Sequence, residues 1–347
     1  MFYRYNAIAA ALLSFATLAP INLAGAADLG AMPAKAKPIV DVPFFFVNDN
    51  RLTYAYEFTG SYPGLSNRTV AQTVAFTHFD AWAYGTNFIN LQLTKYDHAT
   101  PASPCPIFQR GGVCAGATEF YGQIRSTFGF NQIFNTKAFS IGPLRNISFV
   151  VGADGQVMNT FLAPAKKDLV AGLQFAFDLP YKGFFNVAPL LYKEWNHNAF
   201  LTPSFVAAAG GPGILDGNLD YRPTWAVEVN YYMDLGFLPP ELRYFAISGR
   251  AGWYGPKGTG TSTAFVPLTV QPPTAIELNS EPIRLTFDAG KAIWGPKYSH
   301  FADIWVAYRY WQNKFGLDHN VHPACIALAT NHSCTESSLY SGITVKF

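Results

Sequence analysis

The segment 339–347 reads Leu-Tyr-Ser-Gly-Ile-Thr-Val-Lys-Phe and alternates apolar with polar side chains. Its leucine, isoleucine, valine and phenylalanine fall on one face, and Tyr340, Thr344 and Lys346 fall on the other. A period of two residues is the period of a β-strand, whereas an amphipathic helix repeats every 3.6 residues. The segment therefore predicts a strand with one apolar face and one polar face.

The same alternation recurs along the chain and predicts twelve strands. Most of them have 9 to 11 residues, about the length that a tilted strand needs to cross a bilayer. The predicted strands cover residues 52–61, 68–78, 87–95, 119–128, 147–154, 168–178, 184–194, 224–234, 244–254, 281–290, 301–312 and 338–347.

The lengths of the connections support a membrane barrel. Within these boundaries the odd-numbered connections have 6 to 29 residues and the even-numbered ones 5 to 18. A transmembrane barrel with both ends in the periplasm alternates long outer loops with short inner turns. A soluble sandwich has no reason to keep that parity, although a secreted, β-rich soluble protein is the alternative.

Composition narrows the class of protein. Of the 347 residues only 13% are charged, against about 25% in soluble domains, while 50% are hydrophobic and 16% aromatic. A net charge of +2 without a basic cluster argues against nucleic acid as a partner. Disorder is excluded by the apolar content.

The first residues predict an export signal. Arg4 precedes an apolar stretch from Ile8 to Leu18 and a small-residue end before Ala27. This pattern predicts a signal peptide over 1–26, a periplasmic N-terminal segment over 27–51 and the barrel over 52–347. The alternative is an uncleaved anchor helix, for which the apolar core is short. No later apolar run has about 18 residues, so helical spans are not expected.

Aromatic residues lie near several strand ends, where a bilayer places its girdles. These residues are Trp82, Tyr84, Trp195, Trp253, Tyr254, Trp294 and Trp311. The terminal Phe347, preceded by apolar residues at every second position, resembles the assembly signal of bacterial outer-membrane barrels. We therefore expect an all-β, transmembrane, antiparallel up-and-down β-barrel of about twelve strands in the bacterial outer membrane. Its expected partners are membrane lipid and the barrel assembly machinery.

The polar faces of the strands predict what lines the lumen. They hold five basic and four acidic side chains, a mixture expected of a water-filled channel without a ring of one sign. The alternative is that these opposite charges pair with one another across the barrel and only make its interior rigid. Its members are Glu57, Asn90, Gln92, Gln123, Arg125, Asn186, Glu228, Asn230, Tyr232, Arg250, Arg284, Asp288, Asp303, Arg309 and Lys346.

Four cysteines lie in two predicted outer loops. Cys105 with Cys114, and Cys325 with Cys334, have the spacing of local disulfides in an exported protein, and cross-pairing between the loops is the alternative. Histidines lie near the second pair, but the cysteine spacing matches no common zinc motif. No metal and no cofactor are predicted.

Enzyme activity is not expected. Barrel phospholipases carry a His-x-Ser pairing in which the imidazole activates the hydroxyl, and no histidine of this chain has serine two positions later. Phosphate-binding glycine loops and dinucleotide fingerprints are also missing from the sequence.

The segment Trp82-Ala83-Tyr84-Gly85-Thr86-Asn87-Phe88 is similar to a signature of the Tsx-like nucleoside-specific channel family, Trp-Lys-Tyr-Gly-Asp-Asn before an aromatic strand. Trp82, Tyr84, Gly85, Asn87 and Phe88 match, while alanine replaces the lysine and threonine replaces the aspartate. The resemblance covers about twenty residues. It implies a narrow twelve-stranded barrel that passes nucleosides.

We therefore expect a passive outer-membrane channel for small polar solutes, with nucleosides as the first candidates. Aromatic faces would stack on a flat base, and amides and carboxylates would bond the sugar. The alternatives are a structural or adhesive barrel plugged by the loops 195–223 and 255–280, and a lipid-modifying barrel enzyme.

Overall fold

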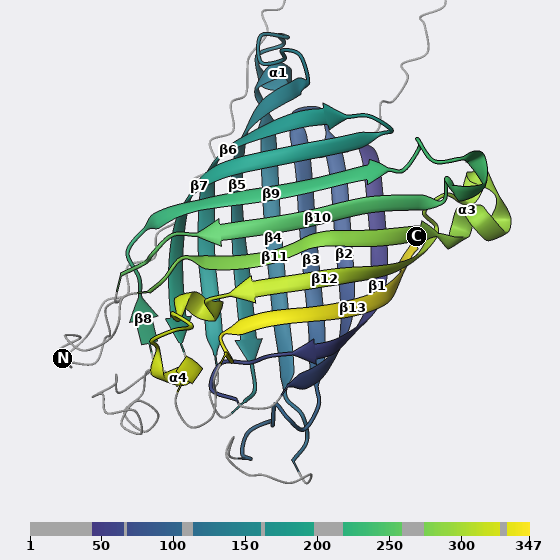
Figure 1. Cartoon of the computed structure of the whole chain (residues 1–347). Coiled ribbons are helices and arrows are strands. Elements are labelled where there is room, and N and C mark those ends of the chain that lie inside the picture. The colour runs from purple at the N-terminus through teal and green to yellow at the C-terminus, as the bar shows by residue number, and fades with distance from the viewer. Residues whose placement is uncertain are drawn as a thin grey trace, which may run out of the picture. The chain divides into compact units, whose positions relative to one another are not determined.

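The computed structural model describes residues 44–65, 68–105, 114–160, 164–197, 218–258, 274–326 and 332–347. These residues belong to the unit Pro43–Phe347, which is dominated by one large sheet (Figure 1). The predicted signal peptide 1–26, and the predicted N-terminal segment up to residue 43, lie outside the described residues.

Twelve long strands form a closed ring. The strand order runs from β6 down to β1 and then from β13 to β7, and β6 also pairs with β7, so the sheet has no free edge among these twelve strands. All pairings are antiparallel, which confirms the predicted up-and-down barrel. The strands are β1 (Phe45–Gly60), β2 (Thr69–Trp82), β3 (Gly85–Tyr96), β4 (Thr118–Gly129), β5 (Leu144–Met158), β6 (Ala165–Leu179), β7 (Gly183–His197), β9 (Thr224–Asp234), β10 (Phe245–Tyr254), β11 (Glu277–Asp288), β12 (Ala302–Gln312) and β13 (Thr335–Lys346).

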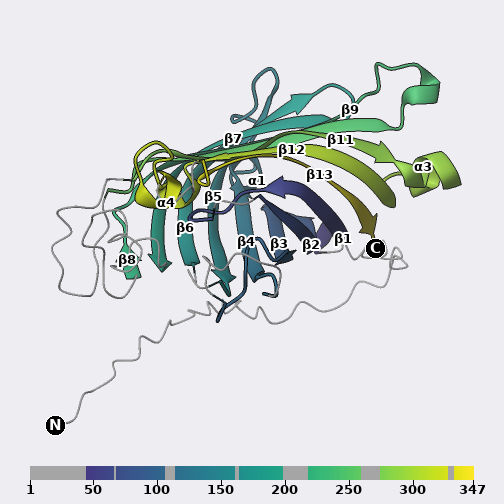
Figure 2. The same cartoon turned by 60° about the horizontal axis from the view of Figure 1, so that its bottom comes forward.

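The strands curve around the interior, and those of the near and far walls cross at a large angle in projection (Figures 1 and 2). This tilt is a geometric requirement for closing a twisted sheet. A short strand, β8 (Asn218–Asp220), pairs with the end of β7.

The first strand of the barrel begins earlier in the chain than predicted. The barrel was expected from residue 52, but β1 begins at Phe45. The segment 44–50 reads Phe-Phe-Phe-Val-Asn-Asp-Asn, so its apolar and polar residues are grouped rather than alternated. The register shift between Phe45 and Val47 accompanies this irregular stretch.

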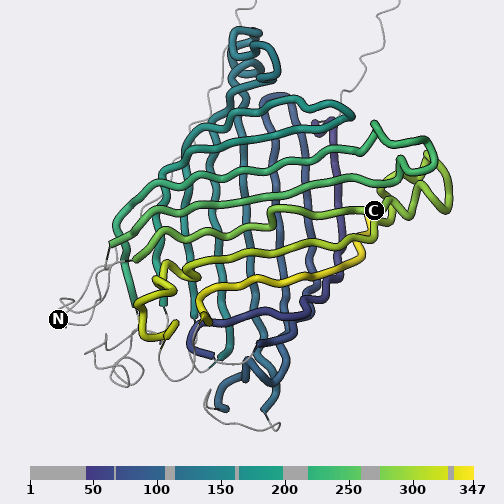
Figure 3. Tube along the Cα trace, in the orientation of Figure 1, coloured from purple at the N-terminus to yellow at the C-terminus, as the bar shows by residue number. Residues whose placement is uncertain are grey.

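The connections confirm the predicted parity. We call the two ends of the barrel the loop end and the turn end (Figure 3). Connections at the loop end have 6 to 26 residues and cover 61–68, 97–117, 159–164, 198–223, 255–276 and 313–334. Connections at the turn end have 2 to 14 residues and cover 83–84, 130–143, 180–182, 235–244 and 289–301.

The helices are short and lie in the connections. They are α1 (Phe130–Ile133), α3 (Ala289–Trp294) and α4 (Pro323–Ile326), with the 3-10 turns η3 (Pro240–Leu242), η4 (Pro296–Tyr298) and η5 (Lys314–Gly316). The C-terminus lies beside α3 at the turn end (Figure 1). Within the described ranges no helix is both long and apolar enough to cross a membrane.

The outer face of the ring is apolar. Large side chains such as Leu93, Phe120, Leu169 and Leu191 are exposed on it, at alternate positions along their strands. Exposed apolar residues repeated around a closed sheet are the lipid-facing surface of a transmembrane barrel.

Two of the predicted girdle aromatics point elsewhere. Tyr254 and Trp311 face the interior, where the Tyr254 hydroxyl donates to Glu228 (3.2 Å) and the Trp311 indole donates to Glu277 (2.9 Å). A position near a strand end does not determine whether a side chain faces lipid or the interior. That depends on whether the residue lies an even or an odd number of positions from its exposed neighbours on the same strand.

Both local disulfides are confirmed. Cys105 is bonded to Cys114 and Cys325 to Cys334, so the alternative cross-pairing between the loops is wrong. Both bridges lie in connections at the loop end.

Gly85 provides a test of the hairpin packing. A Cβ on Gly85 would lie 1.7 Å from the carbonyl oxygen of Thr127, whereas one on Gly155 meets nothing within 4 Å. We expect Gly85→Ala to destabilise the barrel by at least about 1–3 kcal/mol through overpacking. Urea unfolding followed by tryptophan fluorescence measures this, with Gly155→Ala as the matched control. Equal midpoints for the two variants would contradict the steric argument.

Candidate functional site

The predicted lumen residues share the inner face of the ring. Each lies at a position whose strand neighbours include the exposed apolar side chains, and several line an internal cavity. The residues predicted to contact a solute are Glu57 on β1, Gln123 and Arg125 on β4, Glu228, Asn230 and Tyr232 on β9, Arg250 on β10, Arg284 and Asp288 on β11, and Arg309 on β12. Their role in solute passage stays a prediction.

The interior holds more charges than the sequence predicted. Most of the added residues lie near strand ends or in connections, where alternation is weak, whereas Arg51, Asp154 and Glu281 lie farther inside their strands. They are Asp49, Arg51, Glu119, Asp154, Lys166, Asp168, Glu194, Glu277, Glu281 and Glu336 on the strands, with Lys257 and Lys314 from connections at the loop end. The expected near balance of five basic and four acidic groups is therefore wrong, because acids outnumber cations on this face.

A cavity of about 170 Å³ lies inside the barrel. Its lining combines aromatic rings with side-chain amides from strands on opposite sides of the ring. The amides are Asn90, Gln92, Gln123, Gln156 and Asn279, and the rings include those of Phe88, Tyr96, Tyr121, Tyr254 and Trp311. Flat aromatic faces and amides are suited to a ring-shaped polar solute.

One ion-pair cluster crosses the lumen. Arg125 on β4 binds Asp154 on the adjacent β5 (2.6 and 3.1 Å) and reaches Glu228 on β9 (2.7 and 3.0 Å). β4 and β9 are separated in the ring by β5, β6 and β7, so Arg125 forms a strut across the interior. With two carboxylates bound, the guanidinium uses both edges of its planar fork.

A lysine enters the barrel from the connection after β12. Lys314 donates to the backbone oxygen of Ser61 (2.6 Å) and pairs with Glu336, which also forms an ion pair with Arg309 (2.8 Å). Both Lys314 and Glu336 are buried. This contact fixes the connection 313–334 to the inner wall of β13.

A second lysine makes the equivalent contact from the connection after β10. Lys257 donates to Glu194 (2.7 Å) and lies 3.8 Å from Glu277, and all three side chains are buried. Lys166 lies 3.5 Å from Glu194, and Tyr192 donates its hydroxyl to the same carboxylate. Glu194 thus joins Lys257 from the connection to Lys166 and Tyr192 on the wall.

An apolar cluster covers the cavity at the loop end. Tyr62 and Phe315 line the cavity and pack edge to face at 6.2 Å, together with Leu65, Leu317 and the buried Cys325–Cys334 bridge. Two loops, 195–223 and 255–280, were predicted to plug a closed barrel. Of these, residues 198–217 and 259–273 lie outside the described residues. The described cover comes mainly from 61–65 and 313–326.

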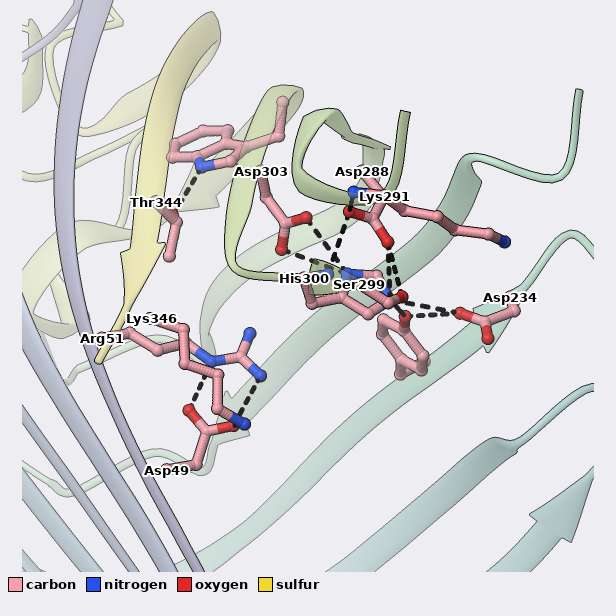
Figure 4. A network of polar contacts seen from close by, with 12 residues as sticks. Asp49, Arg51, Asp234, Asp288, Lys291, Ser299, His300, Asp303, Thr344 and Lys346 are labelled. Carbon is pink, nitrogen blue, oxygen red and sulfur yellow. Dashed lines mark hydrogen bonds and ion pairs between the residues drawn. The ribbon is translucent and has the colours of Figure 1, made fainter. Parts of the chain in front are cut away.

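At the turn end, His300 is surrounded by carboxylates (Figure 4). Its Nδ1 lies 3.1 Å from Asp303, and its Nε2 lies 3.7 Å from Asp234 and 3.9 Å from Asp288. Tyr232 meets the same nitrogen at 3.0 Å. The hydrogen bond with Asp303, opposed by burial, raises the pKa of His300 above its ordinary value.

The segment 82–88, which resembles the Tsx-like signature, forms the turn of the β2–β3 hairpin and the first residues of β3. The Asn87 amide donates to Asp80 (2.9 Å), and the Trp82 ring stacks on Phe44 with centroids 5.8 Å apart. Gly85 leaves space for the backbone of β4, as described above, and Tyr84 packs against Trp82 (5.5 Å). Phe88 is the matching residue that lines the cavity.

A polar row lies on the outer wall near the turn end. His78 meets Asp80 at 3.0 Å, and Ser126 donates to the Asn87 oxygen at 2.7 Å. A lipid-modifying enzyme would need the serine hydroxyl beside the imidazole. Here Asp80 and Asn87 lie between His78 and Ser126 in the row. The imidazole therefore does not contact the serine hydroxyl, as it would in an activated nucleophile.

Comparisons with known proteins give no family. No family model and no curated protein matches the chain. Among solved structures, the translocator domain of autotransporter NalP from Neisseria meningitidis is 8% identical, with 86% of this chain and 88% of that chain covered and a TM-score of 0.38. OccAB3 from Acinetobacter baumannii is 10% identical (86% and 99% covered, TM-score 0.31), and opdK from Pseudomonas aeruginosa is 9% identical (86% and 98%, 0.32).

These low scores carry no argument about function. The class of the molecule, a transmembrane β-barrel of the up-and-down type, rests on its closed strand pairing and its apolar outer face.

Removing the strut tests its contribution to stability. We expect Arg125→Met to lower the free energy of unfolding by about 3–5 kcal/mol, because it leaves Asp154 and Glu228 without their buried partner. The control is Arg145→Met, whose pair with Asp178 is exposed and should cost no more than about 1 kcal/mol. Urea unfolding of the two variants in lipid vesicles measures the difference, and similar losses would contradict a structural role for the strut.

The raised pKa of His300 predicts a pH-dependent stabilisation. Because the folded pKa lies above the unfolded one, the contribution is complete below the unfolded pKa and is lost as pH rises through the folded pKa. The stability difference between the wild type and His300→Gln should therefore be larger at about pH 5.5 than at about pH 9. Unfolding midpoints at the two pH values measure it. A difference that does not change with pH would exclude the ion-pair explanation.

Proposed function

We propose that the chain is an outer-membrane channel through which small polar solutes diffuse, and that nucleoside-like compounds are among them. The observation that carries this proposal is the cavity inside a closed barrel, lined by aromatic rings and amides from opposite walls. Weak contacts of this kind favour passage, whereas one tight site would hold the solute.

The proposed membrane placement follows from the two faces of the wall. The apolar outer face would contact lipid, with the turn end in the periplasm and the longer loop-end connections outside. The backbone amide of Phe347 bonds the oxygen of Asn50 (2.9 Å), and its ring is exposed. We propose that the barrel assembly machinery reads this terminal strand.

A second candidate, a structural barrel with a closed lumen, draws on the loop-end cover. Lys314 and Phe315 hold the connection after β12 over the cavity. Conductance separates the two candidates, because a closed barrel carries no current.

Purified protein in planar bilayers should give discrete conductance steps, and added nucleosides should reduce them. Tyr121→Ala should weaken that block by about tenfold if its ring stacks on the base, since a stacked aromatic is worth about 1–3 kcal/mol. Phe120→Ala is the matched control, because Phe120 is the neighbouring residue on the lipid-facing side. No conductance would refute the channel, and conductance indifferent to nucleosides would remove only that solute class.

A further inference from the structure

The cavity spans opposite walls of the barrel. In the closed order of twelve strands, β10 and β11 lie across the ring from β3 and β4. Arg250 on β10 and Tyr121 on β4 both line the cavity. A solute between these walls would meet side chains from both.

The other charged groups that line the cavity are occupied. Asp154 binds Arg125, and Glu336 binds both Arg309 and Lys314. Lys166 lies 3.5–3.6 Å from two wall carboxylates. The remaining two acids accept hydroxyl groups, Glu57 from Ser338 (2.7 Å) and Glu119 from Tyr96 (2.7 Å).

Arg250 differs from these groups. Its side chain is exposed to the cavity, and in the part of the chain that the structure describes its guanidinium makes no hydrogen bond or ion pair. The acid next to it in register is Glu281 on β11, but that carboxylate accepts Arg284 twice (2.6 and 3.2 Å). Arg284 is in turn held over the Trp305 ring, 3.9 Å from its centroid.

Two side-chain amides, Asn279 and Asn90, also line the cavity near and opposite this cation. The side-chain oxygens of Asn279 on β11 and Asn90 on β3 are enclosed and accept no hydrogen bond from the described residues. Four acids and four cations line the cavity, so no excess of negative charge there opposes an anion.

We propose that Arg250 is the binding group for an oxyanion, a carboxylate or a phosphate, carried by a small ring-containing solute. The planar guanidinium offers paired donors that match both oxyanions. The side-chain amides of Asn90 and Asn279, which line the same cavity, bond polar groups of the solute, and the Tyr121 ring lies against its flat part. This inference deepens the proposed channel function and rests on it for passage, although the binding itself does not require conduction.

Matched neutral and anionic solutes test the proposal. The pairs are adenosine with adenosine 5′-monophosphate, and benzyl alcohol with benzoate, which separate phosphate from carboxylate. In bilayers the preferred anion should block the wild type at a concentration about tenfold lower than its neutral partner does. Arg250→Gln should abolish this difference, because glutamine carries no charge to bind the anion.

Arg145→Gln is the control, because Arg145 is an exposed cation at the turn end, outside the cavity. Heat-dependent gel mobility verifies that each variant is folded. Equal block by the two members of both pairs in the wild type, or retention of the anion preference in Arg250→Gln, would overturn the assignment.

Equilibrium dialysis of the anions against the folded proteins in micelles separates this inference from the channel function. Without conductance in any variant the proposed channel fails, yet weaker anion binding by Arg250→Gln still supports the oxyanion site. Equal anion binding by the wild type and Arg250→Gln overturns the site whether or not the protein conducts.

Discussion

The structure depends on one constraint: every backbone amide of a wall that faces lipid must find its hydrogen-bond partner within the protein. A sheet meets this constraint only when it has no edge, and here the closing pair is β1 with β13. Thr53 and Thr344, 291 residues apart in the chain, join their hydroxyls at 2.9 Å across that pair. Strand length, tilt and the separation into two faces all follow from closing the ring.

Closure also determines where charge can lie. With lipid outside, most charged residues of the spanning strands turn inward, where a partner must offset the cost of desolvation. The strut Arg125–Asp154–Glu228 and the pairs made by Lys257 and Lys314 meet this need. The few charges of the chain are thus concentrated in an interior of linked groups. Arg250, which has no ion-pair partner among the residues that the structure describes, stands out against them.

Much of the wall could be predicted from sequence because alternation is a local property. The strand 224–234 has the predicted bounds, since large apolar residues recur at every second position from Trp225 to Met233. The pattern of alternation is lost in the segment Gly152-Ala153-Asp154-Gly155, because its small residues do not distinguish an apolar face from a polar one. The sequence therefore did not predict that the Asp154 side chain points inward. Lys257 and Lys314 were missed for a different reason, because no periodicity governs a connection.

The lumen face was predictable, but the partners across it were not. Arg125 and Glu228 are 103 residues apart, and only the order of strands around the ring brings them together. The Tsx-like resemblance stays a prediction. Its matching residues build the β2–β3 hairpin, and only Phe88 of them lines the cavity.

The pairing of β1 with β13 has a consequence for biogenesis. The N-terminal strand of the wall acquires its second neighbour only after the C-terminal strand has been made, so the ring cannot close before the last strand is complete. Until then the intermediate carries two unpaired edges and an apolar face, the features that promote aggregation. Both edges must therefore be shielded from other chains until the ring closes.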